Sequence, residues 1–129
     1  MRWLIVFPLL VGCAASEADK VQTSLDRYAS LSAAVAPLES VLSGPVLASA
    51  QRNYQLLHSL ELAQQGLASF EVSSAAGGFV SGCLDLSEVE FFNQRGELLE
   101  LDRQDRARFT ATYDSEYLIS SLEVSQEAC

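Results

Sequence analysis

The chain is poor in basic residues and in the side chains that most enzymes use. Its 129 residues include eight Lys and Arg against seventeen Asp and Glu, three Cys, one His and one Trp, and the formal net charge is -9 at pH 7. This shortage of positive charge excludes a broad phosphate-binding surface, so we expect no nucleic-acid partner. The length indicates one small domain, and an apolar content of 49% is enough for a packed core.

A long hydrophobic run is also missing. The longest apolar stretch, residues 3–11, is interrupted by Pro8 and follows the positively charged Arg2. About 20 apolar residues are needed to cross a bilayer, so this stretch is too short for a membrane helix. A positive residue followed by a short apolar run is typical of a secretory signal peptide.

The apolar stretch ends in Leu10-Val11-Gly12-Cys13, which resembles the lipobox of bacterial lipoproteins. The resemblance implies that the Cys13 thiol receives a diacylglyceryl group, that the peptide bond after Gly12 is cut, and that lipidated Cys13 becomes the N-terminus. Two acyl chains give stable membrane anchoring, whereas a single chain binds only marginally and reversibly. An ordinary signal peptide with an incidental cysteine is the alternative interpretation.

The lipobox interpretation divides the chain into three parts. Residues 1–12 are the predicted signal peptide, residues 13–19 are the lipidated N-terminus with a short polar tether, and residues 20–129 are a single domain. We expect this domain to be exported and anchored to the outer face of the bacterial cell membrane, or to the outer membrane of a Gram-negative cell.

Export affects the oxidation state that we expect for the two remaining cysteines, Cys83 and Cys129. Disulfides persist outside the cytoplasm, so we predict a Cys83–Cys129 bridge, which would restrict the unfolded chain by about 4 kcal/mol in the chain-entropy estimate. There is no C-x-x-C motif, and His58 alone cannot complete a zinc set with two cysteines. No metal site is therefore expected.

The first part of the domain has helical periodicity. Apolar residues recur at helical spacing from Lys20 to Leu42, and Pro37 is expected to kink or end this helix. Ser43-Gly44-Pro45 then predicts the start of a second helix over residues 46–65, with Gly66 as its terminator.

Beyond Gly66 the apolar period changes to two, which indicates strands. The clearest alternation places Ala107, Phe109, Ala111 and Tyr113 on one face, as in an antiparallel strand that is solvated on its other face. The further extended runs are residues 68–73, 79–84, 85–92, 97–101 and 117–124. The sequence therefore predicts an α+β fold in which two N-terminal helices pack on a curved, cone-like antiparallel sheet of four to five strands.

Five phenylalanines are spread over these strands and are expected in the core rather than in a ligand cage. They are Phe70, Phe79, Phe91, Phe92 and Phe109. Phe91 and Phe92 are adjacent and point to opposite faces of a strand, so one of them is placed to line a pocket or meet a partner.

The second half of the domain resembles the cone-shaped domain of the nuclear-transport-factor-2-like superfamily, and more narrowly small actinobacterial lipoproteins. The residues that carry the likeness are Gly82-Cys83-Leu84-Asp85, Val89, Phe91, Asn93-Gln94-Arg95-Gly96 and the closing strand pair over 106–124. The resemblance covers residues 20–125 and implies a pocket between sheet and helix. Some members are isomerases or dehydratases, and many are noncatalytic binding or assembly domains. The fold alone therefore does not distinguish an enzyme from a binding domain.

Isomerase-type members use a tyrosine and one or two acids inside the cone. Their candidate equivalents are Tyr28, Tyr54, His58 and Asp85, but the spacing of these residues matches no motif of those enzymes. The acidic loop with Asp102 and Asp105 lacks the order of a calcium-binding EF-hand loop, and three arginines there oppose a cation. We therefore predict no catalytic, cofactor-binding or metal-binding residue.

No nucleophile elbow, metal cluster or phosphate loop is recognisable in the sequence. We therefore expect a noncatalytic, lipid-anchored binding or assembly domain of the cell envelope that needs no cofactor. Its partner is expected to be an envelope protein or a small apolar ligand, besides the membrane itself. A small isomerase or hydrolase that uses a pocket carboxylate is the alternative, and a structural spacer that pairs as a homodimer is a third hypothesis.

Overall fold

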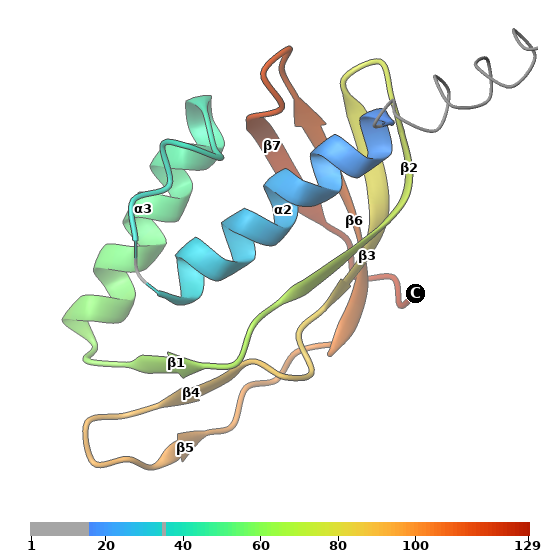
Figure 1. The fold of residues 1–129 in the computed structure, drawn as a ribbon. Coiled ribbons are helices and arrows are strands. Elements are labelled where there is room, and N and C mark those ends of the chain that lie inside the picture. The colour runs from blue at the N-terminus through green and yellow to red at the C-terminus, as the bar shows by residue number, and fades with distance from the viewer. Residues whose placement is uncertain (1–15, 35) are drawn as a thin grey trace, which may run out of the picture.

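A computed structural model of the chain describes residues 16–34 and 36–129. Two helices precede seven strands in this part of the chain, and the strands form two antiparallel sheets (Figure 1). The helices are α2 (Glu17–Ala33) and α3 (Gly44–Ser59). The predicted α+β class is therefore confirmed. The predicted signal peptide, the lipobox and lipidated Cys13 lie outside the described residues.

The larger sheet has four strands in the order β2-β3-β6-β7, all joined antiparallel. Its strands are β2 (Ser69–Ala76), β3 (Phe79–Asp85), β6 (Arg106–Tyr113) and β7 (Ile119–Val124). In Figure 1, α2 lies across this sheet, and α3 stands beside α2. The strand count of this sheet agrees with the prediction of four to five.

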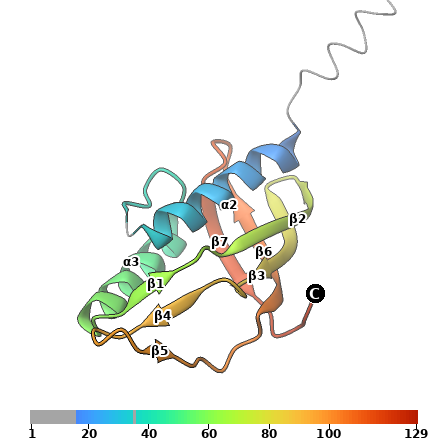
Figure 2. The same cartoon turned by 60° about the horizontal axis from the view of Figure 1, so that its bottom comes forward.

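A second, three-stranded sheet was not predicted. Its strands are β1 (Ala63–Gln65), β4 (Glu90–Phe92) and β5 (Leu98–Leu99), in the order β1-β4-β5. Figure 2 shows this small sheet extending away from the larger one, next to the end of α3 from which β1 leaves. The predicted extended runs over 85–92 and 97–101 thus shrink to short strands of this separate sheet.

The second helix ends at Ser59, so the prediction that it continues to residue 65 is wrong. Glu61 has a φ of 56°, a left-handed conformation that stops a helix, and the Leu62 N–H closes the end by donating to the Leu57 carbonyl at 3.1 Å. The following residues exchange helical hydrogen bonds for pairing with β4. That partner is distant in the sequence, which is why local periodicity missed the change.

The first helix begins before the predicted Lys20, at Glu17. The Ser16 hydroxyl accepts a hydrogen bond from the Asp19 N–H at 3.1 Å and caps the helix. The helix ends at Ala33, before Pro37, as predicted. Leu38 and Leu42 therefore lie outside the helix but are still buried, and Leu42 forms a parallel bridge with Ile119 of β7.

The core lies between α2 and the face of the larger sheet that it covers. Val21, Leu25 and Ala29 of α2 are buried at helical spacing. The predicted alternation in β6 is confirmed, because Ala107, Phe109, Ala111 and Tyr113 are all buried. Phe109 and Phe70 meet edge to face, with ring centroids 5.1 Å apart.

The expectation that Phe79 belongs to the core is wrong, because its side chain is 56% exposed. Phe79 is the first residue of β3, and Val80 and Leu84 are buried on one face of that strand. Successive side chains of a strand point to opposite faces, so Phe79 shares the outer face with Ser81 and Cys83. The neighbouring Val80, and not Phe79, therefore contributes to the core.

The predicted cysteine bridge agrees with the structure. Cys83 and Cys129 are bonded through their sulfur atoms, with their Cα atoms 5.9 Å apart and a sequence separation of 46 residues. The C-terminal tail reaches this position along β6, where Arg108 donates its N–H to the Glu127 carbonyl and accepts from the Ser125 N–H. The bridge covers the outer face of β3.

Candidate functional site

The most prominent concave feature in the described part of the chain is a cavity of about 520 Å³ between α2, α3 and the junction of the two sheets. Cavities that hold small ligands commonly enclose about 300–1,000 Å³. The cavity exists because α3 contacts the larger sheet mainly through β7 and has no buried residue of its own. The C-terminal half of α3 therefore forms one wall of the cavity, and its side chains do not fill it.

Two helices supply one side of the cavity. Tyr28, Ala29 and Ser32 of α2 line it, and they share one helix face because Ser32 is four residues from Tyr28 and three from Ala29. On α3, the pairs Asn53–Tyr54 and Leu57–His58 are one turn apart and also line it. The two helices thus present a mixture of apolar and polar side chains to the same space.

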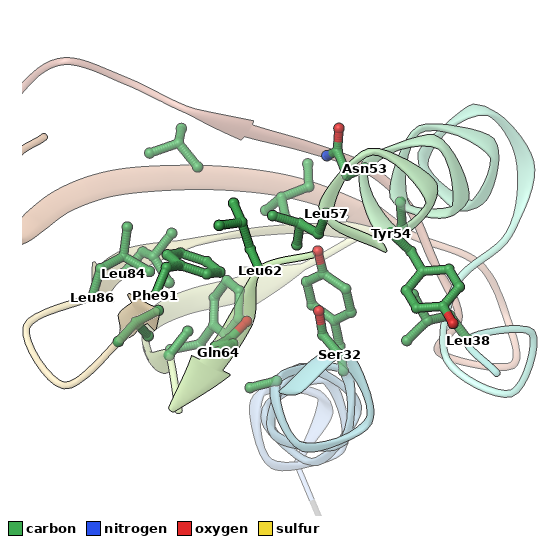
Figure 3. Close-up of a pocket in the computed structure, with 18 of the residues that line it drawn as sticks. Ser32, Leu38, Asn53, Tyr54, Leu57, Leu62, Gln64, Leu84, Leu86 and Phe91 are labelled. Atoms are coloured by element: carbon green, nitrogen blue, oxygen red, sulfur yellow. The ribbon is translucent and has the colours of Figure 1, made fainter. Parts of the chain in front are cut away.

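The floor of the cavity is apolar and buried. Phe70, Leu84 and Val89 line it and are 5%, 6% and 4% exposed. Figure 3 shows Leu84, Leu86 and Phe91 gathered at one end of the cavity. Phe91 lines this pocket, as one of the two adjacent phenylalanines was expected to do.

Four polar side chains of the two helices line the cavity and are exposed to solvent. Ser32, Asn53, Tyr54 and His58 are all exposed, and Tyr54 is 45% exposed. The Tyr54 and His58 rings stack with centroids 6.1 Å apart. Within the described residues, none of these four side chains makes a hydrogen bond to another protein group. Their polar atoms are free to bind water or a ligand.

Tyr28 is a half-buried polar residue of the lining. Its ring packs against Phe70, with centroids 6.0 Å apart, and burial raises the pKa of its hydroxyl above the ordinary value. The phenol is therefore neutral at physiological pH and can donate or accept a hydrogen bond. It is not a tyrosinate that would act as a base.

Arg103 also lines the cavity, but its guanidinium already has protein partners. Its Nη2 donates to the Leu86 carbonyl at 3.0 Å and to the Val89 carbonyl, and its Nε lies 3.7 Å from an Asp105 carboxylate oxygen. These contacts fix the chain between β3 and β4 against the wall of the cavity. Arg103 therefore stabilises the wall of the cavity, and its guanidinium is not free to bind an anion.

Of the four residues considered as catalytic candidates, three line the cavity and one does not. Tyr28, Tyr54 and His58 come together there, whereas Asp85 lies outside it. Hydrogen bonds from the side chain and backbone of Ser87 hold the pKa of the Asp85 carboxyl below its usual range, and Arg106 adds to this effect. Asp85 thus closes a turn after β3. No Asp or Glu lines the cavity in the described part of the chain.

The described residues contain no group of three or more His, Cys, Asp or Glu side chains that could hold a metal ion. Asp105 of the acidic loop pairs with Arg103 instead. Within the same residues, no helix has both the length and the apolar content needed to cross a membrane.

Sequence reasoning missed the contribution of the segment after α3. Leu62 and Gln64 line the cavity because the helix stops early and β1 pairs with β4. The only local signal was Gly66, which has a φ of 80° and lies so close to the Glu88 carbonyl that a Cβ could not fit there.

A comparison with models of known protein families and a search of curated proteins both find no match for this chain.

Proposed function

We propose that this chain is a lipid-anchored, extracytoplasmic binding domain that holds a small apolar ligand in the cavity between α2, α3 and the sheets. The observation that supports the proposal is the cavity itself, with about 520 Å³ of space above a buried floor of Phe70, Leu84 and Val89. Removing apolar surface from water stabilises a complex by about 25 cal/mol per Å². A ligand that covers this floor gains affinity from that term.

The lipid anchor is the second part of the proposal and depends on the lipobox. Helix α2 begins at Glu17, four residues after Cys13. Each residue spans at most about 3.6 Å, so lipidation at Cys13 would hold the start of α2 within roughly 14 Å of the lipid attachment point. The domain would then work beside the membrane, where apolar molecules concentrate.

The alternative, a small isomerase or hydrolase, needs a pocket carboxylate as general base or acid. The described lining of this cavity contains His58 and two tyrosines but no carboxylate, and Asp85 is engaged with Ser87 and Arg106. The binding proposal uses every feature of the cavity without requiring such a group. We therefore favour binding over catalysis.

A pair of adjacent leucines on α3 tests the cavity. Leu57 lines it, whereas Leu56 does not line it and is 57% exposed. We expect a diazirine-bearing hexadecanol, photolysed with membranes that carry the full chain, to label the wild type and the Leu56→Trp variant. Labelling of the Leu57→Trp variant should fall strongly, because the indole occupies the cavity.

The readout is the amount of labelled chain, with the labelled peptides assigned by mass spectrometry. Thermal unfolding of both variants provides the control for folding. Equal labelling of the two tryptophan variants, or no labelling of the wild type, would contradict the proposed cavity function.

A further inference from the structure

We infer that the cavity ligand is a single-chain amphiphile with an uncharged, hydrogen-bonding head, and that it lies with its head between α2 and α3 and its chain toward Leu84 and Phe91. This inference rests on the proposed binding function and goes beyond it. It assigns a ligand class and a direction to the cavity.

The direction follows from how polarity and exposure vary along the cavity. Ser32, Asn53 and Tyr54 are exposed polar residues on the two helices. Leu84 is 6% exposed, and in Figure 3 it lies with Leu86 and Phe91 away from the side chains of Asn53 and Tyr54. A hydrocarbon chain is stabilised where water is excluded, and a polar head is stabilised where water and unpaired polar groups remain.

The side-chain donors of Gln64 and Arg103, elsewhere in the lining, already have protein partners, which favours the α2–α3 side for the head. The Gln64 Nε2 donates to the Gly66 carbonyl at 3.1 Å. The Arg103 guanidinium is held by the carbonyls of Leu86 and Val89. By contrast, the side chains of Ser32 and Asn53 have no protein hydrogen-bond partner in the described part of the chain.

The charge of the head follows from the formal charges around it. The lining described by the structure contains no carboxylate to pair with a cationic head. An anionic head would find no free guanidinium or ammonium there, and it would approach a chain whose formal net charge is -9. Hydroxyl, amide and imidazole groups of Ser32, Asn53, Tyr54 and His58 suit an uncharged head such as an alcohol or an ester.

Two probes with the same head and chain test the direction. One hexadecanol carries its diazirine next to the head, and the other carries it near the chain end. In membranes that contain the full chain, we expect the head-proximal probe to label peptides of α2 and α3. The chain-end probe should label the peptides that contain Leu84, Leu86 and Phe91. The reverse pattern, or the same peptides with both probes, would overturn the inference.

Three probes with the same chain and different heads test the charge: an alcohol, a carboxylate and a primary ammonium, all compared in the same buffer. We expect the alcohol to reach half-maximal labelling at a concentration about fivefold lower than either charged probe, a difference of the size that one hydrogen bond provides. Equal or tighter labelling by a charged probe would overturn the assignment of an uncharged head.

Two variants on different faces of α3 separate the head contact from folding. We expect Asn53→Ala to reduce the preference for the alcohol, and we expect Gln55→Ala, which changes an exposed residue outside the cavity, to preserve it. Loss of the preference in both variants, or in neither, would contradict a head contact at Asn53. A complete lack of labelling by all probes contradicts the proposed function, whereas labelling without the expected direction or preference contradicts only this inference.

Discussion

At the scale of single residues, Gly82 is one of the tightest positions in the sheet. It lies in β3 between β2 and β6, opposite Val72 and Phe109. A Cβ at this position would collide with the Glu71 carbonyl oxygen and would lie 3.0 Å from the Phe109 ring. The absence of a side chain at residue 82 thus allows β2 and the Phe109 ring to approach β3 closely.

We expect Gly82→Ala to lower the free energy of unfolding by about 3 kcal/mol, because the methyl group must push backbone and core apart. Gly77→Ala is the matched control, because Gly77 has a φ of 62° but open space around a Cβ. Left-handed strain alone costs about 1–2 kcal/mol. Urea denaturation of both variants measures the difference. A Gly82→Ala variant no less stable than Gly77→Ala would refute the steric argument.

A second residue-scale feature joins the start of α2 to the end of β6. The Tyr113 hydroxyl donates to a Glu17 carboxylate oxygen at 2.5 Å, and its ring stacks on Tyr117. Burial, helped by the hydrogen bond to Glu17, raises the pKa of Tyr113 from 10.0 to about 12. The protonated phenol is therefore favoured in the folded chain.

Because the folded pKa is the higher one, this contribution to stability is complete below pH 10 and is lost as the pH rises from 10 to about 12. We expect the free energy of unfolding to fall more steeply across this interval in the wild type than in Tyr113→Phe. Tyr54→Phe, which changes an exposed tyrosine, should keep the steep decline. Equal slopes for the wild type and Tyr113→Phe would rule out this linkage.

At the scale of elements, α2 protects the edge of the larger sheet. β2 is an edge strand with an irregularity between Val72 and Ser74. The Gln22 side chain of α2 donates to the Phe70 carbonyl at 2.6 Å and accepts from the Val72 N–H at 3.1 Å. Its amide thus satisfies backbone groups that an exposed edge would offer to another chain.

Gln22→Leu keeps the bulk of this side chain but leaves the Phe70 carbonyl and the Val72 N–H without their partner. We expect a loss of about 2 kcal/mol in the free energy of unfolding and faster hydrogen exchange at the Val72 amide. Gln51→Leu is the control, because Gln51 makes only an exposed contact of 3.5 Å with Glu39. A loss no larger than that of the control would show that Gln22 does not protect the edge.

Also at this scale, the two helices differ in what their sequences reveal. In α2, residues Val21, Leu25 and Ala29 form one buried stripe, and the helical spacing of Val21 and Leu25 predicted the helix. The apolar residues of α3 predicted a helix but not its environment, because Leu57 faces a cavity and Leu56 faces solvent. Periodicity identifies an apolar face, but it does not say whether protein or empty space lies opposite.

At the scale of the whole molecule, the proposed anchor and the domain are joined by very few residues. Ser16 already caps α2, so the predicted tether is largely helix in its described part. The bridge between Cys83 and Cys129 ties the C-terminal tail to β3. The proposed arrangement is a rigid domain held close to the membrane instead of one on a long, mobile linker.

We expect Cys13→Ser to abolish incorporation of labelled palmitate and to move the chain out of the membrane fraction, because the thiol that forms the thioether is gone. Fractionation with metabolic labelling measures both effects. Cys83→Ser is the control, since it removes another cysteine without touching the lipobox and should leave the chain in the membrane fraction. Membrane retention and labelling of the Cys13→Ser chain would refute lipid anchoring.

The sequence by itself determined the α+β class, the pairing of Cys83 with Cys129 and the buried face of β6, and it motivated the anchor hypothesis. These features depend on local periods, on a short motif and on the count of cysteines. Only the tertiary structure decided that α3 stops at Ser59, that β1 pairs with β4 and that Asp85 stays outside the cavity. The physical reason is that a cavity depends on how far packed elements stand apart, and that distance is set by contacts between residues remote in the chain.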